Sequence, residues 1–188
     1  MNKSIPIFIV LFISLFWAIS IFVSPFLIPS GSVRGLDGYA NSIDYSDLWD
    51  NMPLFPRIIY TIGDFNCHQK EDRTFIINED QMPVCTRDTG VFTAIPIGLF
   101  LALFIRVGDD FLSTFLNIFP KKIRGVRNKS TIVFLIIFLF ILPIAIDGGL
   151  QFFMDYESTN IKRVITGMLA GFIGGYLIGV MLLGLKGK

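Results

Sequence analysis

Residues 134–146 read FLIIFLFILPIAI, a run with no charged and no polar side chain. A helix on the surface of a soluble protein keeps one polar face toward water, and this run has none. The chain contains four uncharged stretches, at residues 4–33, 89–105, 130–146 and 164–185. A helix crosses the hydrocarbon core of a bilayer in about 17–25 residues. The sequence therefore predicts an all-α membrane protein, folded as a four-helix transmembrane bundle in a single domain.

The four predicted spans divide the rest of the chain into three connections. We place the spans at residues 5–28, 89–106, 130–147 and 164–185. The connections are residues 30–88, 107–129 and 148–163. The first uncharged stretch is longer than the apolar core of a signal peptide, which has about 7–15 residues, and no small-x-small cleavage site precedes Pro25. We therefore expect the first helix to be retained.

Composition agrees with a membrane protein. Of the 188 residues, 53% are hydrophobic and 16% are charged, against about 25% charged residues in a typical soluble domain. The net charge of +1 indicates neither nucleic acid nor an acidic macromolecule as a partner. The partner that the composition predicts is membrane lipid.

Basic residues predict the orientation of the bundle. The connection between the second and third spans contains PKKIRGVRNKS (120–130), which has five basic residues and no acidic one. Lys3 precedes the first span, and Lys186 and Lys188 follow the fourth. With four spans these three segments fall on one side, and basic segments favour the cytoplasm. We expect a multi-pass protein of the cell membrane with both termini cytoplasmic and with residues 30–88 and 148–163 outside.

Two shorter helices are expected outside the spans. Residues 107–120 carry apolar side chains at helical spacing, which are Phe111, Leu112, Phe115, Leu116 and Phe119. This pattern favours a short amphipathic helix in the cytoplasmic interface, ended by Pro120. The segment 45–66 suits a helix on the outer membrane surface, with Trp49 and Tyr60 at the interface.

The fourth span carries glycine at every fourth position, as Gly167, Gly171, Gly175 and Gly179. Glycines at this spacing lie on one helix face and allow another helix to approach closely. The stripe predicts tight contact within the bundle or, alternatively, a homo-oligomer that forms through these residues.

Polar side chains from four separate segments are expected at the outer membrane face. They are Cys67, His68, Gln69, Arg73, Cys85, Arg87, Asp88, Asp147, Gln151, Asn160 and Arg163. The only histidine and both cysteines of the chain belong to this set. Charged residues at span ends also pair without any chemistry.

The cysteines allow three interpretations, a metal site, a disulfide or free thiols. A metal site would use Cys67, His68, Cys85 and Asp88, where Cys85 and Asp88 have the two-residue gap of a zinc half-site. A disulfide would join Cys67 to Cys85 alone and would persist on the oxidising side of the membrane. Closing that loop of about 18 residues would stabilise the outward segment by roughly 3 kcal/mol in the chain-entropy model.

The remaining polar residues suit an anionic substrate. His68 could act as a general base that Asp147 orients, and Arg73, Arg87 and Arg163 could stabilise developing negative charge. Gln69, Gln151 and Asn160 would contribute to binding. These residue types fit an enzyme acting on an anionic lipid-type substrate. The alternative is a non-catalytic structural or transport-associated membrane protein whose external loop the Cys67–Cys85 disulfide holds.

Several spaced motifs resemble an uncharacterised family of small prokaryotic integral-membrane proteins, a domain of unknown function. They are Cys-His-Gln (67–69) with Arg73 and Phe75, then Pro83, Cys85, Arg87 and Gly90, then Asp147, Gly148 and Gln151, and finally Ser158, Asn160, Arg163, Thr166 and Gly167. The resemblance implies a helical membrane fold in which these residues form one site, and it implies no reaction. Asp88 stands where that family often has a third cysteine. This exchange is compatible with a metal ligand and not with a dithiol shuttle at that position.

Overall fold

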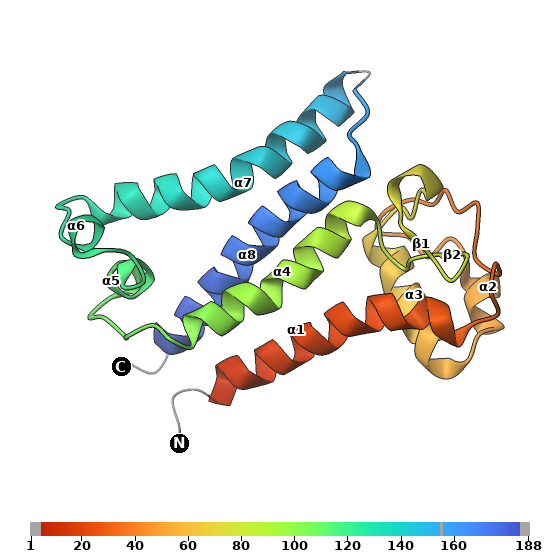
Figure 1. Ribbon diagram of the computed structural model, residues 1–188, viewed down its shortest axis with the longest axis horizontal. Coiled ribbons are helices and arrows are strands. Elements are labelled where there is room, and N and C mark those ends of the chain that lie inside the picture. The colour runs from red at the N-terminus through yellow and green to blue at the C-terminus, as the bar shows by residue number, and fades with distance from the viewer. Residues whose placement is uncertain (1–4, 155, 185–188) are drawn as a thin grey trace.

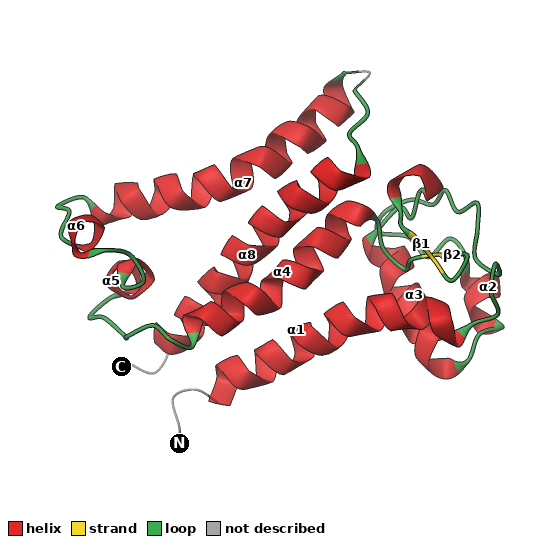
Figure 2. Cartoon of the chain, viewed as in Figure 1, coloured by secondary structure: helices red, strands yellow, loops and turns green. Residues whose placement is uncertain are grey.

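A computed structural model describes residues 5–154 and 156–184 of the chain. The long helices are α1 (Ile5–Val23), α4 (Thr86–Ala102), α7 (Lys129–Phe153) and α8 (Asn160–Gly184). The shorter helices are η1 (Ser24–Leu27), α2 (Ser46–Asp50), α3 (Leu54–Asn66), η2 (Glu71–Arg73), α5 (Phe111–Leu116) and α6 (Lys121–Arg124). Two short strands are β1 (Ile76–Ile77) and β2 (Asp80–Gln81). The mostly helical fold predicted from the sequence is confirmed (Figure 2).

Within the described residues, three helices are long and apolar enough to cross a membrane, namely Ile5–Leu27, Lys129–Phe153 and Asn160–Gly184. The second predicted span corresponds to α4, which has 17 residues and is continued by a turn to Ile105. In Figure 1, α4 lies between α1 and α8, and α7 lies on the other side of α8. Phe12, Phe134 and Leu139 point away from the other helices and are exposed, as side chains in contact with lipid would be.

The contact between α4 and α8 is made by backbone, because glycine lines it on both helices. A Cβ atom added to Gly167, Gly171 or Gly175 would overlap a carbonyl oxygen of α4. A Cβ atom on Gly90 or Gly98 of α4 would overlap a carbonyl oxygen of α8 in the same way. The glycine stripe thus serves close contact within the chain. A homo-oligomer through the same residues would require α4 to leave this face.

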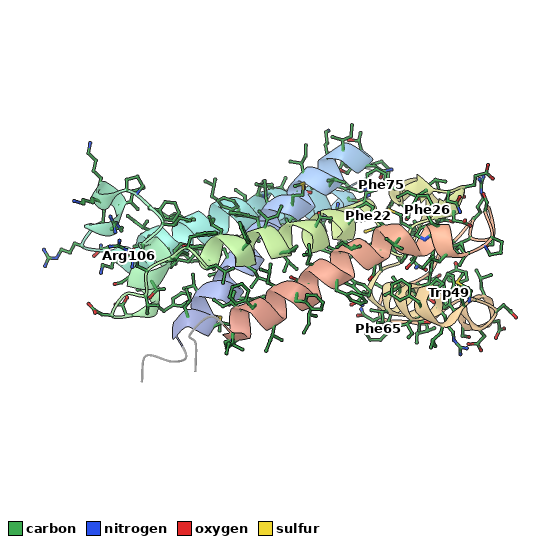
Figure 3. The ribbon with its side chains drawn as sticks, turned by 60° about the horizontal axis from the view of Figure 1, so that its bottom comes forward. Phe22, Phe26, Trp49, Phe65, Phe75 and Arg106 are labelled. Atoms are coloured by element: carbon green, nitrogen blue, oxygen red, sulfur yellow. The ribbon has the colours of Figure 1, made fainter. Side chains whose placement is uncertain are left out.

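Residues between η1 and α4 fold into a small segment with its own core, called the outward segment after the side of the membrane predicted for it (Figures 1 and 3). Trp49 stacks on Tyr60 with ring centroids 5.0 Å apart, and both side chains are buried together with Val33 and Leu36. The Trp49 indole donates a hydrogen bond of 2.8 Å to the buried carboxylate of Asp64. The helix α3 was expected, but the interfacial position expected for Trp49 and Tyr60 was wrong, because these rings form the core of the segment.

A hairpin connects this segment to α4. Ile76 pairs with Gln81 and Ile77 with Asp80, in an antiparallel arrangement. The two turn residues, Asn78 and Glu79, both have positive φ angles of 54° and 64°. This is the backbone of a tight two-residue turn. The hairpin carries the chain back across the outward segment to the first residue of α4.

The opposite end of the molecule carries α5, α6 and Arg106 (Figure 3). The first turn of α1 and the last turn of α8 lie at this same end (Figure 1). The amphipathic helix expected within residues 107–120 is present as α5, and Asp110 caps it by accepting the Ser113 N–H at 2.6 Å. Lys3, Lys186 and Lys188, on which part of the predicted orientation depends, lie outside the described residues.

Candidate functional site

Cys67, Cys85 and Asp88 come together where the outward segment meets α4. Cys67 follows the last residue of α3, and Cys85 is the N-cap of α4, with Asp88 in its first turn. The two sulfur atoms and a carboxylate oxygen of Asp88 all lie within 4.8 Å of one another. The Cys85 sulfur is 3.2 Å from Oδ2 of Asp88. Three of the four predicted metal ligands are thus neighbours.

Backbone N–H groups point at the Cys67 sulfur. The N–H of Cys85 donates a hydrogen bond of 3.2 Å to it, and the N–H of Gln69 donates a second. The pKa of the Cys67 thiol is raised, chiefly by its hydrogen bond with Cys85 and then by burial. Two buried sulfur atoms this close do not both ionise readily without a compensating positive charge.

Gln69 holds the two cysteine-bearing segments together. Its φ angle of 46° turns the chain back on itself, and its side chain is fully buried. The amide Nε2 donates to the carbonyl oxygen of Pro83 at 2.6 Å, and the side chain of Gln81 donates to the Gln69 carbonyl at 3.0 Å. Gly63 of α3 lets the Pro83 backbone approach, since a Cβ there would overlap its carbonyl oxygen.

His68 lies beside this group without joining it. Its Nδ1 accepts a hydrogen bond of 3.3 Å from the N–H of Lys70. Burial lowers the pKa of His68, and the nearby charge of Arg73 lowers it further, against the opposing effect of Asp88. Within the described residues it makes no hydrogen bond with Asp147, the partner expected for a general base.

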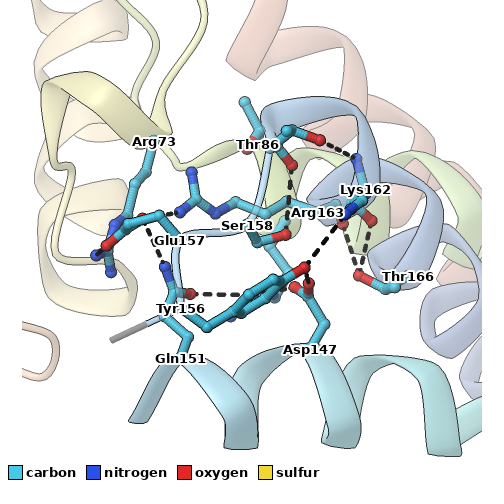
Figure 4. Close-up of polar contacts among 12 residues, drawn as sticks. Arg73, Thr86, Asp147, Gln151, Tyr156, Glu157, Ser158, Lys162, Arg163 and Thr166 are labelled. Atoms are coloured by element: carbon cyan, nitrogen blue, oxygen red, sulfur yellow. Dashed lines mark hydrogen bonds and ion pairs between the residues drawn. The ribbon is translucent and has the colours of Figure 1, made fainter. Parts of the chain in front are cut away.

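A second cluster joins α4, α7 and α8 through arginines (Figure 4). Arg87 of α4 donates to Oδ2 of Asp147 of α7 at 2.5 Å and to Oε1 of Gln151 at 3.3 Å. Asp147 and Gln151 are four residues apart and share a face of α7, as the sequence suggested. This contact fixes the C-terminal end of α7 against α4.

Glu157 bridges two further arginines. One carboxylate oxygen accepts Arg73 at 2.5 Å, and the other accepts Arg163 at 2.8 Å. Arg163 is 3% exposed, whereas the Glu157 side chain is 63% exposed. Burial raises the pKa of Glu157, but the charges and hydrogen bonds of the two arginines outweigh it and hold that pKa below its usual value. Gln151 also donates to this carboxylate, at 3.0 Å.

Asn160 lies at the start of α8, and its Oδ1 accepts hydrogen bonds from Arg163 at 3.0 Å and from the Thr86 hydroxyl at 3.2 Å. Glu157 and Thr86 belong to this cluster but were not among the site residues predicted from the sequence. Glu157 precedes the Ser-x-Asn motif by one residue, and Thr86 follows Cys85, so adjacency to the motifs was the one available signal.

Some hydrogen-bond donors of the arginine cluster have no partner. Among the described residues, the buried Nε atoms of Arg73, Arg87 and Arg163 have no hydrogen-bond partner, although Arg73 Nε is 3.4 Å from an Asp72 carboxylate oxygen. The three guanidinium groups hydrogen-bond two carboxylates, those of Asp147 and Glu157. Unsatisfied buried donors of this kind are uncommon in folded proteins and call for an explanation.

Comparison with known proteins gives a family and no activity. Residues 67–177 match the family described as predicted membrane protein (DUF2085). An uncharacterized protein of Methanocaldococcus jannaschii is 29% identical over 164 residues, which cover 87% of this chain and 84% of that protein. An uncharacterized protein of Methanothermobacter thermautotrophicus is 34% identical over 105 residues, covering 56% of this chain and 77% of that protein. No solved structure matches the chain.

Proposed function

The chain belongs to the DUF2085 family of predicted membrane proteins, and we propose that it binds the phosphate group of a lipid at the outer face of the cell membrane. In this proposal α1, α4, α7 and α8 all span the bilayer and form one domain. The basic segment that includes α6 and the ends of the chain then lie in the cytoplasm.

The observation that carries the proposal is the set of unpartnered guanidinium donors. Arg73, Arg87 and Arg163 come from three different elements and converge on two carboxylates. Guanidinium groups bind phosphate through pairs of parallel hydrogen bonds. A phosphate would accept hydrogen bonds from the Nε donors that have no partner. The exposed Glu157 carboxylate, which touches both Arg73 and Arg163, is the group that an incoming phosphate would displace.

The surroundings favour a lipid over a soluble phosphate. Phe152, Phe153 and Met154 directly follow Gln151, and they are 83%, 81% and 65% exposed. Exposed aromatic and apolar side chains at the end of a spanning helix lie at the boundary of the hydrocarbon core. The arginine cluster would then lie at headgroup depth, with Gln151 and Asn160 placed to orient the bound group. An enzymatic step on the same lipid would use these residues, and His68 lies beside Arg73.

Lipid binding to the purified protein in detergent tests the proposal. The probes are phosphatidic acid, diacylglycerol with the same acyl chains, and inorganic phosphate as a competitor. We expect phosphatidic acid to bind more tightly than diacylglycerol, and Arg73→Gln to weaken that preference about tenfold or more, since a charge-assisted hydrogen bond contributes about 1.5–3 kcal/mol. The Arg73 side chain is only 20% exposed, so the helix content of the variant is checked by circular dichroism before its binding is compared.

Arg57→Gln is the matched control, because Arg57 is an exposed, ion-paired arginine on the same face, outside the cluster. Equal binding by the Arg73 and Arg57 variants would overturn the proposal. Competition by inorganic phosphate at similar concentration would replace the lipid by a soluble anion as the ligand.

Orientation is tested by labelling intact cells with an impermeant maleimide, which should reach Tyr39→Cys and not Lys122→Cys. The opposite pattern would reverse the topology.

A further inference from the structure

We propose that Cys67, Cys85 and Asp88 bind a zinc ion that ties the outward segment to α4. The proposal is independent of lipid binding, because it uses none of the three arginines. It uses side chains from two elements that meet only in the folded chain, the end of α3 and the start of α4.

Distances between the ligand atoms suit zinc. Zinc binds cysteine sulfur at about 2.3 Å and carboxylate oxygen at about 2.0–2.2 Å in a tetrahedral arrangement. Two such ligands on one ion lie roughly 3.5 Å apart. The Cys85 sulfur and Oδ2 of Asp88 are 3.2 Å apart, and all three ligand atoms lie within 4.8 Å. Small side-chain rotations are therefore enough to bring the two sulfur atoms and the carboxylate oxygen to one ion.

The backbone supplies the second requirement of a zinc–thiolate site. A thiolate that binds zinc is steadied by N–H donors around its sulfur. The Cys67 sulfur accepts the N–H of Gln69, two residues further on, and the N–H of Cys85 across the fold. The left-handed backbone at Gln69 aims the first of these donors, and the buried Gln69 side chain keeps that backbone in place.

The surroundings of the three ligands favour a cation. Ile21, Ile59, Met82 and Val84 are buried around the cysteines and exclude water from them. The nearby arginines do not compete for Asp88, because Arg87 is paired with Asp147 and Arg73 with Glu157. Without a cation the two buried thiols stay protonated, and a zinc ion would take the place of both protons between the sulfur atoms and the Asp88 carboxylate. The fourth position is left to water, because His68 lies beside the three ligands without joining them.

Metal analysis with thiol counting on the purified protein is the first test. We expect one zinc per chain and two thiols that become reactive only after denaturation and chelation. No metal and no reactive thiols would mean a Cys67–Cys85 disulfide and would overturn the proposal. Reactive thiols without metal, after equilibration with zinc, would overturn it as well.

Variants assign the ligands without relying on a disruptive change. Asp88→Asn should speed the loss of zinc to a chelator at least tenfold, whereas Asp88→Cys should slow it below the rate of the unchanged protein, since a third thiolate binds zinc more strongly. Asp72→Asn, at an exposed acid of the same outward segment, is the control and should leave the rate unchanged. Equal rates in all three variants would overturn the role of Asp88.

The visible absorption spectrum of the cobalt-substituted protein reports the coordination of the metal. Cobalt in the site should give the intense visible absorption of tetrahedral coordination with thiolate charge-transfer bands, and Cys85→Ser should reduce the charge-transfer intensity by about half, because one of two thiolates is lost. Unchanged bands in this variant would contradict the assignment. Arg73→Gln should bind cobalt normally, so a failure of lipid binding and a failure of metal binding are separate results.

Discussion

Alanine at Gly175 should destabilise the protein, whereas alanine one position earlier should not. A Cβ atom at Gly175 would overlap the carbonyl oxygen of Ile95 and lie 2.9 Å from the Ile95 carbonyl carbon and Cα atom. Ordinary van der Waals contact begins at 3.4 Å. The helices α4 and α8 must therefore separate by at least about 0.5 Å at this point. The neighbouring backbone contacts between the two helices are lost together with the contact at Gly175.

The neighbouring Gly174 faces open space, since nothing lies within 4 Å of a Cβ atom built there. Both substitutions gain the same helix preference of alanine over glycine, about 0.5–1 kcal/mol. Only Gly175→Ala suffers overpacking, which costs typically about 1–3 kcal/mol. The difference in unfolding free energy between the two variants isolates that cost. Gly174→Ala should be neutral or slightly more stable than the unchanged protein.

Reversible unfolding in mixed micelles with increasing dodecyl sulfate measures this difference. Circular dichroism follows the helices, and tryptophan fluorescence follows both Trp17, whose ring contacts Phe92 of α4 edge-on, and Trp49 in the outward segment. We expect the Gly175→Ala transition at a clearly lower fraction of dodecyl sulfate. Coincident transitions for the two variants would refute the close backbone contact between α4 and α8.

Three further changes test other contacts. Asp64→Ala should destabilise the outward segment by about 1–3 kcal/mol, because the buried Trp49 indole N–H and the N–H groups of Asp44 and Tyr45 lose their acceptor; limited proteolysis should cut this variant faster. Glu157→Gln should flatten the acid side of a plot of Tm against pH. The folded pKa of Glu157 is depressed, so its stabilisation is present above the unfolded pKa of about 4.3 and is lost as pH falls through the folded value; an unchanged profile would contradict this. Tyr176→Phe removes a hydrogen bond of 2.6 Å to the carbonyl of Phe115 and should loosen α5 by about 1–3 kcal/mol, seen as faster hydrogen exchange in residues 111–116.

Features that depend on local sequence were predictable. The helices follow from stretches with no polar face, and the role of Gly167, Gly171 and Gly175 follows from their spacing. The proximity of Cys85 to Asp88 follows from a gap of three positions at the start of a helix. In each case one segment contains all the information that the prediction needs.

Features that depend on contacts between segments far apart in the sequence were not predictable. Glu157 looked like an ordinary anchor at a helix end, and its role appears only when Arg73 and Arg163 are brought to it from two other elements. Strands of two residues are too short to show any alternation, so the hairpin at Asn78 left no periodic signal. Aromatic residues between charged ones suit a membrane interface and a small folded segment equally well, which is why Trp49 was misplaced.

The glycine repeat has a consequence for the register of α8 along α4. A four-residue period looks the same after a slip of four residues, a shift of about 6 Å along the helix axis. The contact between the glycine stripe of α8 and the backbone of α4 therefore does not define a unique alignment of the two helices. Side chains that do not repeat must define it, such as Asn160, the first residue of α8, which meets Thr86 of α4, and Tyr176, in the second half of α8, which donates to the Phe115 carbonyl of α5. Removing both contacts should leave a stable helix pair that samples more than one alignment.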